Sequence, residues 1–339
     1  MAETSMLVSN RLPRAVGLLG IGVIGSGWAA RFILNGVDVR VYGRSTGAVE
    51  RVQERLAKAR RAYRRLTRVS LPSEGSLSVV KSIADAVQGV ELVQESAPEC
   101  LEVKQQLLAE ASRAAAPGTL ICSSTSGFRP SLLQAKTENP ERVLVAHPFN
   151  PVYLVPLIEL SAGQHTAPEA VAQAAEIYRV VGMHPLFVRK EVEGFIANRL
   201  QTAVWREALW LVHDDLATVQ EIDDAVRYSF GLRQPILGPF LTYFVGSGQT
   251  SFRSFLEKWG PGQKSCSKLE EVPEYTDAFL HKLTEQSNAR ALAENLTISE
   301  FEQKLEDGIV AVLNGLRSLD YGAGETLSRW EQGLRDRVP

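Results

Sequence analysis

Hydrophobic positions along this chain follow two different patterns. Up to about residue 190, short apolar runs recur with helical stretches between most of them, which is typical of a parallel sheet covered by helices. From Glu193 to about Leu319, the apolar residues follow helical periodicity instead, with almost no β-branched runs. The pattern predicts an α/β protein, with an N-terminal Rossmann-type doubly wound sheet followed by an all-helical C-terminal domain. The expected strands cover residues 16–20, 37–43, 77–80, 91–96, 118–124, 142–148 and 184–190.

The change of pattern near Lys190–Glu193 sets the expected domain boundary. A length of 339 residues agrees with two domains. The expected parts are an N-terminal tail over 1–14, a dinucleotide-binding domain over 15–190, a helical domain over 191–320 and a C-terminal tail over 321–339.

Charge and composition exclude several classes of function. A net charge of -2 argues against nucleic acid as the main partner. No run of 18 apolar residues is present, and residues 1–14 lack the basic and apolar regions of a secretory signal, so we expect neither a membrane span nor export. The three scattered cysteines fit a reducing compartment rather than a disulfide framework or a zinc site. We therefore expect a cytoplasmic protein without a metal, in which Cys122 is a small buried hydrophobe.

A glycine-rich turn follows the first expected strand. Gly20, Gly22 and Gly25 fit the pattern G-x-G-x-x-G, with Val23 and Ile24 between the last two. In such a turn the first glycine allows the tight bend, the second admits a pyrophosphate, and the third lets the helix pack on the strand. The helix N-terminus then offers free N–H groups to the phosphates. These five residues are expected to bind a dinucleotide.

The end of the second expected strand carries the signal for the kind of nicotinamide cofactor. An Asp or Glu there holds the 2′-hydroxyl of NAD, but this chain has Gly43-Arg44-Ser45. Arg44 offers a planar, permanently charged group suited to phosphate, and Ser45 adds a hydroxyl. NADP is therefore favoured. NAD stays the alternative if Arg44 only stacks on the adenine, or if Gly43 only serves the turn.

A histidine and a glutamate form the strongest candidate for catalysis. His147 ends an expected strand, and Pro148 and Pro151 stiffen the turn that follows. Glu159 lies inside an apolar run, where an unpaired carboxylate would be costly, so we expect His147 to be its partner. A carboxylate on one imidazole nitrogen leaves the other nitrogen as a base. The pair therefore predicts a base for oxidising an alcohol with hydride transfer to nicotinamide.

Two further polar residues can complete this site. Ser126 follows an expected strand at the sheet edge where Rossmann ligands bind, and it can hydrogen-bond the reacting oxygen. The alternative is a helix cap or turn. Asn198 opens the helical domain and can hold the same oxygen from the other side. The alternative is an ordinary polar residue on a helix that faces the other domain.

Residues 51–68 form a basic stretch with eight Lys and Arg residues and one acid, Glu54. The favoured interpretation is a solvated, protruding helix. The alternative is a basic arm near a phosphate-bearing substrate or a partner subunit.

Taken together, these motifs resemble the 3-hydroxyacyl-CoA dehydrogenase superfamily, and within it the L-carnitine 3-dehydrogenases. The resemblance covers about residues 15–320. It rests on GIGVIGSGWAARFILNG (20–36), ESAPECLEVKQQLL (95–108), SSTSGF (123–128), HPFNPVYLVPLIEL (147–160), GFIANRL (194–200), WREALWLVHDDLATVQEIDDAVRYSFGLR (205–233), GPFLTY (238–243) and EQSNAR (285–290).

The resemblance implies a role for each matching residue. His147 and Glu159 match the catalytic dyad of the family, and Ser126 and Asn198 match residues that contact substrate. The segment Glu95 to Glu99 matches one beside the nicotinamide end of the cofactor. Glu99 and Lys104 are therefore expected to bind cofactor, and a homodimer joined through the helical domain is implied.

The chain departs from the carnitine enzymes at two places. The carnitine enzymes are similar to NAD enzymes that have an acid at the position where this chain has Gly43. The resemblance also leads us to expect an aromatic residue at the position where this chain has Gln234-Pro235. A quaternary ammonium group is usually held by aromatic faces. The candidates for such a box, each of which can equally be a core residue, are Trp205, Trp210, Tyr228, Phe240, Tyr243 and Phe244.

We therefore expect an NAD(P)-dependent dehydrogenase that oxidises the 3-hydroxyl group of a small hydroxy acid. L-carnitine, converted reversibly to 3-dehydrocarnitine, is the leading substrate. The open alternatives are a 3-hydroxyacyl-CoA or another 3-hydroxy acid oxidised with NADP, an engineered variant, and a non-catalytic, crystallin-like protein with the same fold.

Overall fold

The structure of the chain is a computed structural model that describes residues 11–43, 47–247 and 298–337, with scattered residues between 249 and 282. Arg44 and Ser45, on which the cofactor prediction depends, lie outside these ranges. Within the described ranges no helix is long and apolar enough to cross a membrane. The same residues contain no group of three or more His, Cys, Asp or Glu side chains placed to hold a metal ion.

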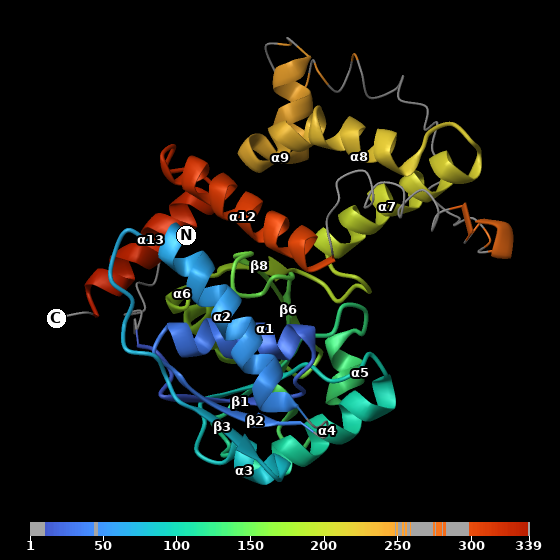
Figure 1. Cartoon of the computed structure of the whole chain (residues 1–339). Coiled ribbons are helices and arrows are strands. Elements are labelled where there is room, and N and C mark those ends of the chain that lie inside the picture. Colours follow the sequence, from blue (N-terminus) through green and yellow to red (C-terminus); the bar gives the residue numbers. More distant parts are fainter. Residues whose placement is uncertain are drawn as a thin grey trace. The chain divides into compact units, whose positions relative to one another are not determined.

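Contacts within the chain divide it into two compact units, which Figure 1 shows in colours that follow the sequence. The first unit consists of Met1–Ile196 together with Glu306–Pro339, and the second consists of Ala197–Leu305. The division by contacts falls at Ile196, a few residues after the change of pattern near Lys190–Glu193. Residues 306–339, which the sequence divides between the helical domain and a tail, group with the sheet.

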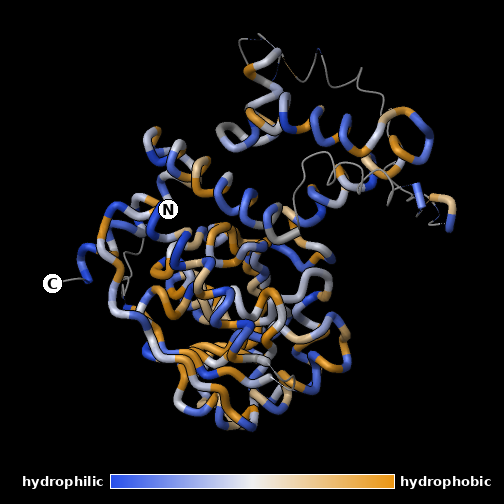
Figure 2. Tube along the Cα trace, viewed as in Figure 1, coloured by the Kyte–Doolittle hydropathy of each residue, from blue (hydrophilic) through white to orange (hydrophobic). Residues whose placement is uncertain are grey.

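The first unit contains one sheet of eight strands. Seven of them lie within two residues of the ranges expected from the apolar runs, and the eighth contains Glu159. Figure 2 colours the trace by hydropathy, and hydrophobic stretches recur throughout the sheet unit. The strands are β1 (Ala15–Leu19), β2 (Asp38–Tyr42), β3 (Leu77–Val80), β4 (Leu92–Glu95), β5 (Leu120–Ser123), β6 (Val143–Pro148), β7 (Leu157–Ala162) and β8 (His184–Val188).

The order of the strands confirms the doubly wound fold, with one exception to the predicted parallel arrangement. The order is β3-β2-β1-β4-β5-β6-β7-β8, so the chain leaves β1 in one direction and returns to extend the sheet in the other. All neighbouring pairs are parallel except β6 and β7, which are antiparallel. The turn between these two strands is too short for the crossover that a parallel pair needs.

Helices make up most of the remaining described chain. The helix over Phe230–Gly246 is bent at Gly238, where φ is 67°, and it contains Pro235 and Pro239. The helices are α1 (Val23–Leu34), α2 (Ala48–Leu66), α3 (Ile83–Val87), α4 (Leu101–Ala114), α5 (Pro130–Gln134), the short 3-10 helix η1 (Pro140–Arg142), α6 (Pro168–Val180), α7 (Ala197–His213), α8 (Val219–Arg227), α9 (Phe230–Gly246), α12 (Ile298–Arg317) and α13 (Ala323–Arg335).

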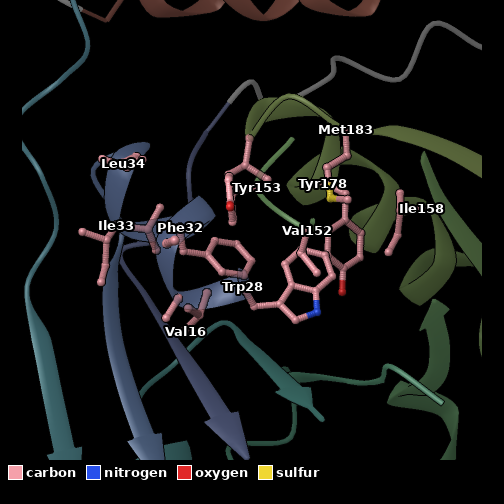
Figure 3. Packing of buried hydrophobic residues seen from close by; sticks show 14 of the residues in the cluster. Val16, Trp28, Phe32, Ile33, Leu34, Val152, Tyr153, Ile158, Tyr178 and Met183 are labelled. Carbon is pink, nitrogen blue, oxygen red and sulfur yellow. The ribbon is translucent and has the colours of Figure 1, made fainter. Parts of the chain in front are cut away.

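Both faces of the sheet are covered, because alternate strand residues point to opposite faces. One buried cluster joins Val16 and Leu18 of β1 to α1, α2, α6 and α13. A second cluster joins Ala15 and Leu19 of the same strand to α3, α4 and α5. Trp28 of α1 lies at the centre of the first cluster, within 5.6 Å of the Phe32 ring and 5.4 Å of the Tyr178 ring between centroids (Figure 3).

The basic stretch that includes α2 does not protrude, so that part of the favoured interpretation was wrong, although the charged face of the helix is exposed to solvent as expected. Its apolar residues repeat at helical spacing and are buried in the first cluster, as Leu56 and Tyr63 show. Tyr63 packs edge-on against Trp330 of α13, with ring centroids 5.1 Å apart. On the polar face, Arg61 and Arg65 form ion pairs with Asp307 of α12. These contacts are the physical reason that residues 306–339 belong to the sheet unit.

Candidate active site

The glycine turn has the geometry that its sequence predicts. Gly20 has a φ of 105°, and a Cβ atom there would lie 2.6 Å from the carbonyl oxygen of Ser96. A Cβ atom at Gly25 would lie 2.2 Å from the carbonyl oxygen of Gly20, so side chains are excluded at both positions. At Gly22 no heavy atom lies within 4 Å of the Cβ position. The turn is therefore closed on the protein side and open on the side where a pyrophosphate would approach.

A cavity of about 610 Å³ lies against this turn. It stands at the carboxyl ends of β1, β2 and β4, where ligands of open α/β sheets bind. The N-terminus of α1 begins after Gly22, and its first turn contains no acid that would repel phosphate. These features fit a dinucleotide. The cavity is lined by Gly20, Ile21, Gly22, Val23, Ile24, Tyr42, Gly43, Arg51, Ser96, Ala97, Pro98 and Leu107.

A buried ion-pair cluster lies next to the wall of this cavity. Lys104 and Glu95 are 1% and 0% exposed, and the Lys104 Nζ atom lies 2.9 Å from Glu95 Oε1. The same Nζ atom donates to the carbonyl oxygen of Ala97 at 3.2 Å and lies 3.2 Å from Glu99 Oε2. Lys104, expected as a cofactor-binding residue, thus reaches the cavity wall through the backbone of Ala97.

Glu99 connects this cluster to the segment that contains Ser126. Its Oε1 atom accepts the backbone N–H groups of Ser126 at 3.1 Å and Gly127 at 3.2 Å, and it also accepts the hydroxyl of Thr125. Burial acts to raise the pKa of Glu99, but the Thr125 hydroxyl and the Lys104 cation outweigh it and hold this pKa below its ordinary value. Glu99 is therefore an ionised group that fixes the turn after β5.

A second polar network lies beneath the same edge of the sheet. The Ser124 hydroxyl accepts hydrogen bonds from Trp28 Nε1 at 3.1 Å and from Gln94 Nε2 at 2.7 Å. It also lies 2.9 Å from the hydroxyl of Ser96, which is in the cavity wall. The buried polar groups at the ends of β4 and β5 are thus mutually satisfied, which fixes the position of the wall.

His147 and Glu159 are brought together by strand register. They are direct partners across the antiparallel pair β6 and β7, and His147 Nδ1 lies 2.9 Å from Glu159 Oε2. The two side chains are 7% and 0% exposed. The other carboxylate oxygen of Glu159 accepts the backbone N–H of Ile196 at 2.9 Å. The carboxylate therefore has protein partners on both oxygens, as a buried charge requires.

Two phenylalanines hold the imidazole in place. The ring of Phe149 stands edge-on to His147 with centroids 4.7 Å apart, and Phe195 lies at 5.4 Å. Phe195 is fully buried and has a φ of 51°, a left-handed conformation that follows Gly194 with φ 72°. The backbone N–H of Ile196, the next residue, is the donor to Glu159.

The other two predicted catalytic residues belong to different units of the chain. Ser126 is exposed and follows β5, the parallel neighbour of β6, in which His147 is the penultimate residue. Both residues are therefore at the same edge of the sheet. Asn198 lies in the first turn of α7, in the second unit. Its predicted role stays a prediction.

Family models match the expected dinucleotide-binding domain and the first two thirds of the expected helical domain. The model of the 3-hydroxyacyl-CoA dehydrogenase NAD binding domain matches residues 15–192, and that of the C-terminal domain of the same enzymes matches residues 194–285. The chain belongs to the 3-hydroxyacyl-CoA dehydrogenase family. It is accordingly an oxidoreductase that acts on a CH–OH group with a nicotinamide cofactor.

Named relatives within this family include carnitine enzymes. The L-carnitine dehydrogenase of Mesorhizobium japonicum is 44% identical over 90% of this chain and 84% of its own length. A longer relative from Ruegeria pomeroyi, named L-carnitine dehydrogenase/betainyl-CoA thioesterase, is 43% identical, and the match covers 95% of this chain and 66% of that protein. Among solved structures, 5-formyl-3-hydroxy-2-methylpyridine 4-carboxylic acid 5-dehydrogenase is 27% identical, with a TM-score of 0.72 over 88% of this chain and 97% of that one.

Sequence reasoning missed several residues of this dehydrogenase site. The resemblance places the segment Glu95 to Glu99 beside the nicotinamide, but only the tertiary structure shows that Glu95 pairs with Lys104 and that Ser96 lines the cavity. Arg51 was counted only as part of the basic stretch, although it lines the cavity. The available signal was its position in the first turn of α2, because the start of this helix closely follows the carboxyl end of β2, where ligands bind.

Proposed function

We propose that this enzyme oxidises the 3-hydroxyl group of L-carnitine reversibly to 3-dehydrocarnitine, with His147 as the general base. The observation that carries the proposal is the 2.9 Å contact between His147 Nδ1 and the buried carboxylate of Glu159 at the carboxyl end of β6. A positioned imidazole backed by a carboxylate is what the removal of an alcohol proton needs.

The roles of the residues follow from this contact. Because Nδ1 is held by Glu159, Nε2 is the nitrogen that takes the hydroxyl proton, and the carboxylate stabilises the imidazolium that forms. Ile196 holds the second carboxylate oxygen and so fixes the direction of the pair. A nicotinamide cofactor, when bound, would supply the acceptor for the hydride that leaves the carbinol carbon. Ser126 and Asn198 hydrogen-bond the reacting oxygen in this proposal.

The identity of the substrate is supported by the relatives named L-carnitine dehydrogenase at 43% and 44% identity. The second candidate substrate is a 3-hydroxyacyl-CoA, which is favoured by the description of the family model. The two differ in the group attached to the same 3-hydroxy unit. The choice between them therefore depends on the parts of the site that contact the trimethylammonium or the thioester.

A substrate panel tests this choice. L-carnitine and 3-hydroxybutyryl-CoA are each supplied with NAD and with NADP, and the nicotinamide absorbance is followed. We expect kcat/KM for L-carnitine to exceed that for the thioester by about 10-fold or more, because a site built for a cation discriminates strongly against a substrate without one. Turnover of the thioester alone would contradict the carnitine assignment, and no turnover of any 3-hydroxy acid would favour the non-catalytic alternative.

The cofactor is proposed to be NADP in preference to NAD. The family model that matches this chain is that of an NAD binding domain. The support for NADP instead of NAD is the sequence Gly43-Arg44-Ser45, which has no acid. We expect Arg44→Asp to reduce the ratio of kcat/KM with NADP to kcat/KM with NAD by about 10-fold or more, since a carboxylate repels a 2′-phosphate. Arg64→Asp, on the exposed face of α2, is the matched control. An unchanged ratio in Arg44→Asp would mean that Arg44 does not contact the 2′-phosphate.

A homodimer joined through the second unit is also proposed. Its described helices expose large apolar side chains, including Trp205 at 60%, Tyr228 at 72% and Phe240 at 75%. Exposed aromatic residues at this density are typical of a surface that another subunit covers. The same residues were candidates for core positions or for an ammonium box, and their exposure argues against the core. The cytoplasmic location expected from the cysteines stays a prediction.

A further inference from the structure

Arg51 is a charged residue in the wall of the dinucleotide cavity. It lies in the first turn of α2, where its backbone N–H donates to the carbonyl oxygen of Gly47 at 3.1 Å. Its Nε atom donates to the carbonyl oxygen of Ile21, within the glycine turn, at 3.4 Å. An atom of its guanidinium lies 3.3 Å from the Cβ position at Gly47. The side chain thus extends from the start of α2 to the glycine turn.

The cavity around Arg51 suits an anion on the adenosine ribose. Among the described residues that line the cavity, Arg51 carries the only formal charge. Tyr42, the last residue of β2, and Gly43, which follows it, line the same cavity. In a Rossmann unit the ribose of the adenosine lies at this strand end, where an acid would select a free 2′-hydroxyl. Here a glycine follows the strand, and a guanidinium reaches the cavity from the next helix.

We propose that Arg51 binds the 2′-phosphate of NADP and is a specificity-determining residue separate from Arg44. The inference rests on the proposed preference for NADP. A guanidinium presents several N–H donors in one plane, so one edge can stay on the carbonyl of Ile21 while another meets a phosphate. The helix fixes the base of this side chain, which makes Arg51 a positioned contact.

Nucleotide fragments test this proposal without any turnover. The dissociation constants of 2′,5′-ADP and 5′-AMP are measured by calorimetry on the full chain, because the two ligands differ only in the 2′-phosphate. We expect Arg51→Gln to weaken 2′,5′-ADP by about 10-fold or more, the loss of one charge-assisted contact, and to change 5′-AMP by less than about 2-fold. Arg51→Lys should keep part of the affinity for 2′,5′-ADP, because the charge remains.

Arg64→Gln is the matched control, since it removes the same charge from an exposed position of the same helix. It should leave both constants unchanged, and thermal unfolding of each variant checks that the fold is kept. Equal weakening of both fragments by Arg51→Gln would place Arg51 against the base or the 5′-phosphate and overturn the proposal. An unchanged preference of Arg51→Gln for 2′,5′-ADP over 5′-AMP would also overturn the proposal. A wild-type chain that binds both fragments equally would overturn the NADP preference itself, while the carnitine assignment would still stand on the substrate panel.

Discussion

Replacing His147 with glutamine is expected to lower kcat by about 10²–10⁴-fold, which is the usual contribution of a positioned general base. Glutamine is close in size to histidine and can still hydrogen-bond the buried carboxylate of Glu159, which now accepts from Nδ1 at 2.9 Å. It cannot take a proton from an alcohol at neutral pH. The loss should therefore fall on kcat, while the dissociation constant of the cofactor stays close to that of the wild type.

Single-turnover and steady-state rates at saturating substrate measure this effect. His165→Gln is the matched control, because the His165 side chain is exposed and lies beyond the end of β7, outside the dyad. Glu159→Gln should give an intermediate loss, since it keeps the shape of the side chain but removes the charge that stabilises the imidazolium. If His147→Gln kept kcat within about 10-fold of the wild type, the imidazole would not be the base, and the proposed mechanism would fail.

The sheet and the glycine turn were predictable because their signals are local. A strand buried on both faces is a short apolar run between turn residues, and seven such runs became strands within two residues of the expected ends. The pairing of His147 with Glu159 was predictable for a different reason. A carboxylate at a fully buried strand position needs a partner, and the tight turn after His147 leaves an antiparallel neighbour as the nearest one.

Contacts between distant segments were not predictable from local patterns. The basic residues of α2 suggested a solvated helix, but an amphipathic helix with a charged face has an apolar face as well, and here that face is covered by α1 and α13. Trp330 lies more than two hundred residues from Tyr63 in the sequence and still packs against it. Nothing near either residue signals the other, so the assignment of residues 321–339 to a tail could not anticipate this contact.

The buried pair of Lys104 and Glu95 leads to the largest expected effect on stability. Lys104→Met should lower the free energy of unfolding by about 3–5 kcal/mol, because it leaves the carboxylate of Glu95 buried without its cation. The remaining partners of Glu95, the backbone N–H of Ala97 and the hydroxyl of Ser123, are neutral and do not replace that charge. Urea unfolding measures the loss, and Lys81→Met, at an exposed position, is the matched control.

A double variant separates the charge from the packing in this prediction. In Lys104→Met/Glu95→Gln the buried carboxylate is replaced by an amide, so most of the loss in Lys104→Met should be recovered if an unpaired charge causes it. If the loss came from the shape of the methionine, the double variant would be no more stable than the single one. A loss below about 1 kcal/mol in Lys104→Met would show that Glu95 takes up a proton or reaches water when its partner is removed. Lys104 also holds the carbonyl of Ala97 in the cavity wall, so folded Lys104→Met should bind cofactor more weakly than the wild type. An unchanged dissociation constant for the cofactor would assign the pair to the stability of the fold alone.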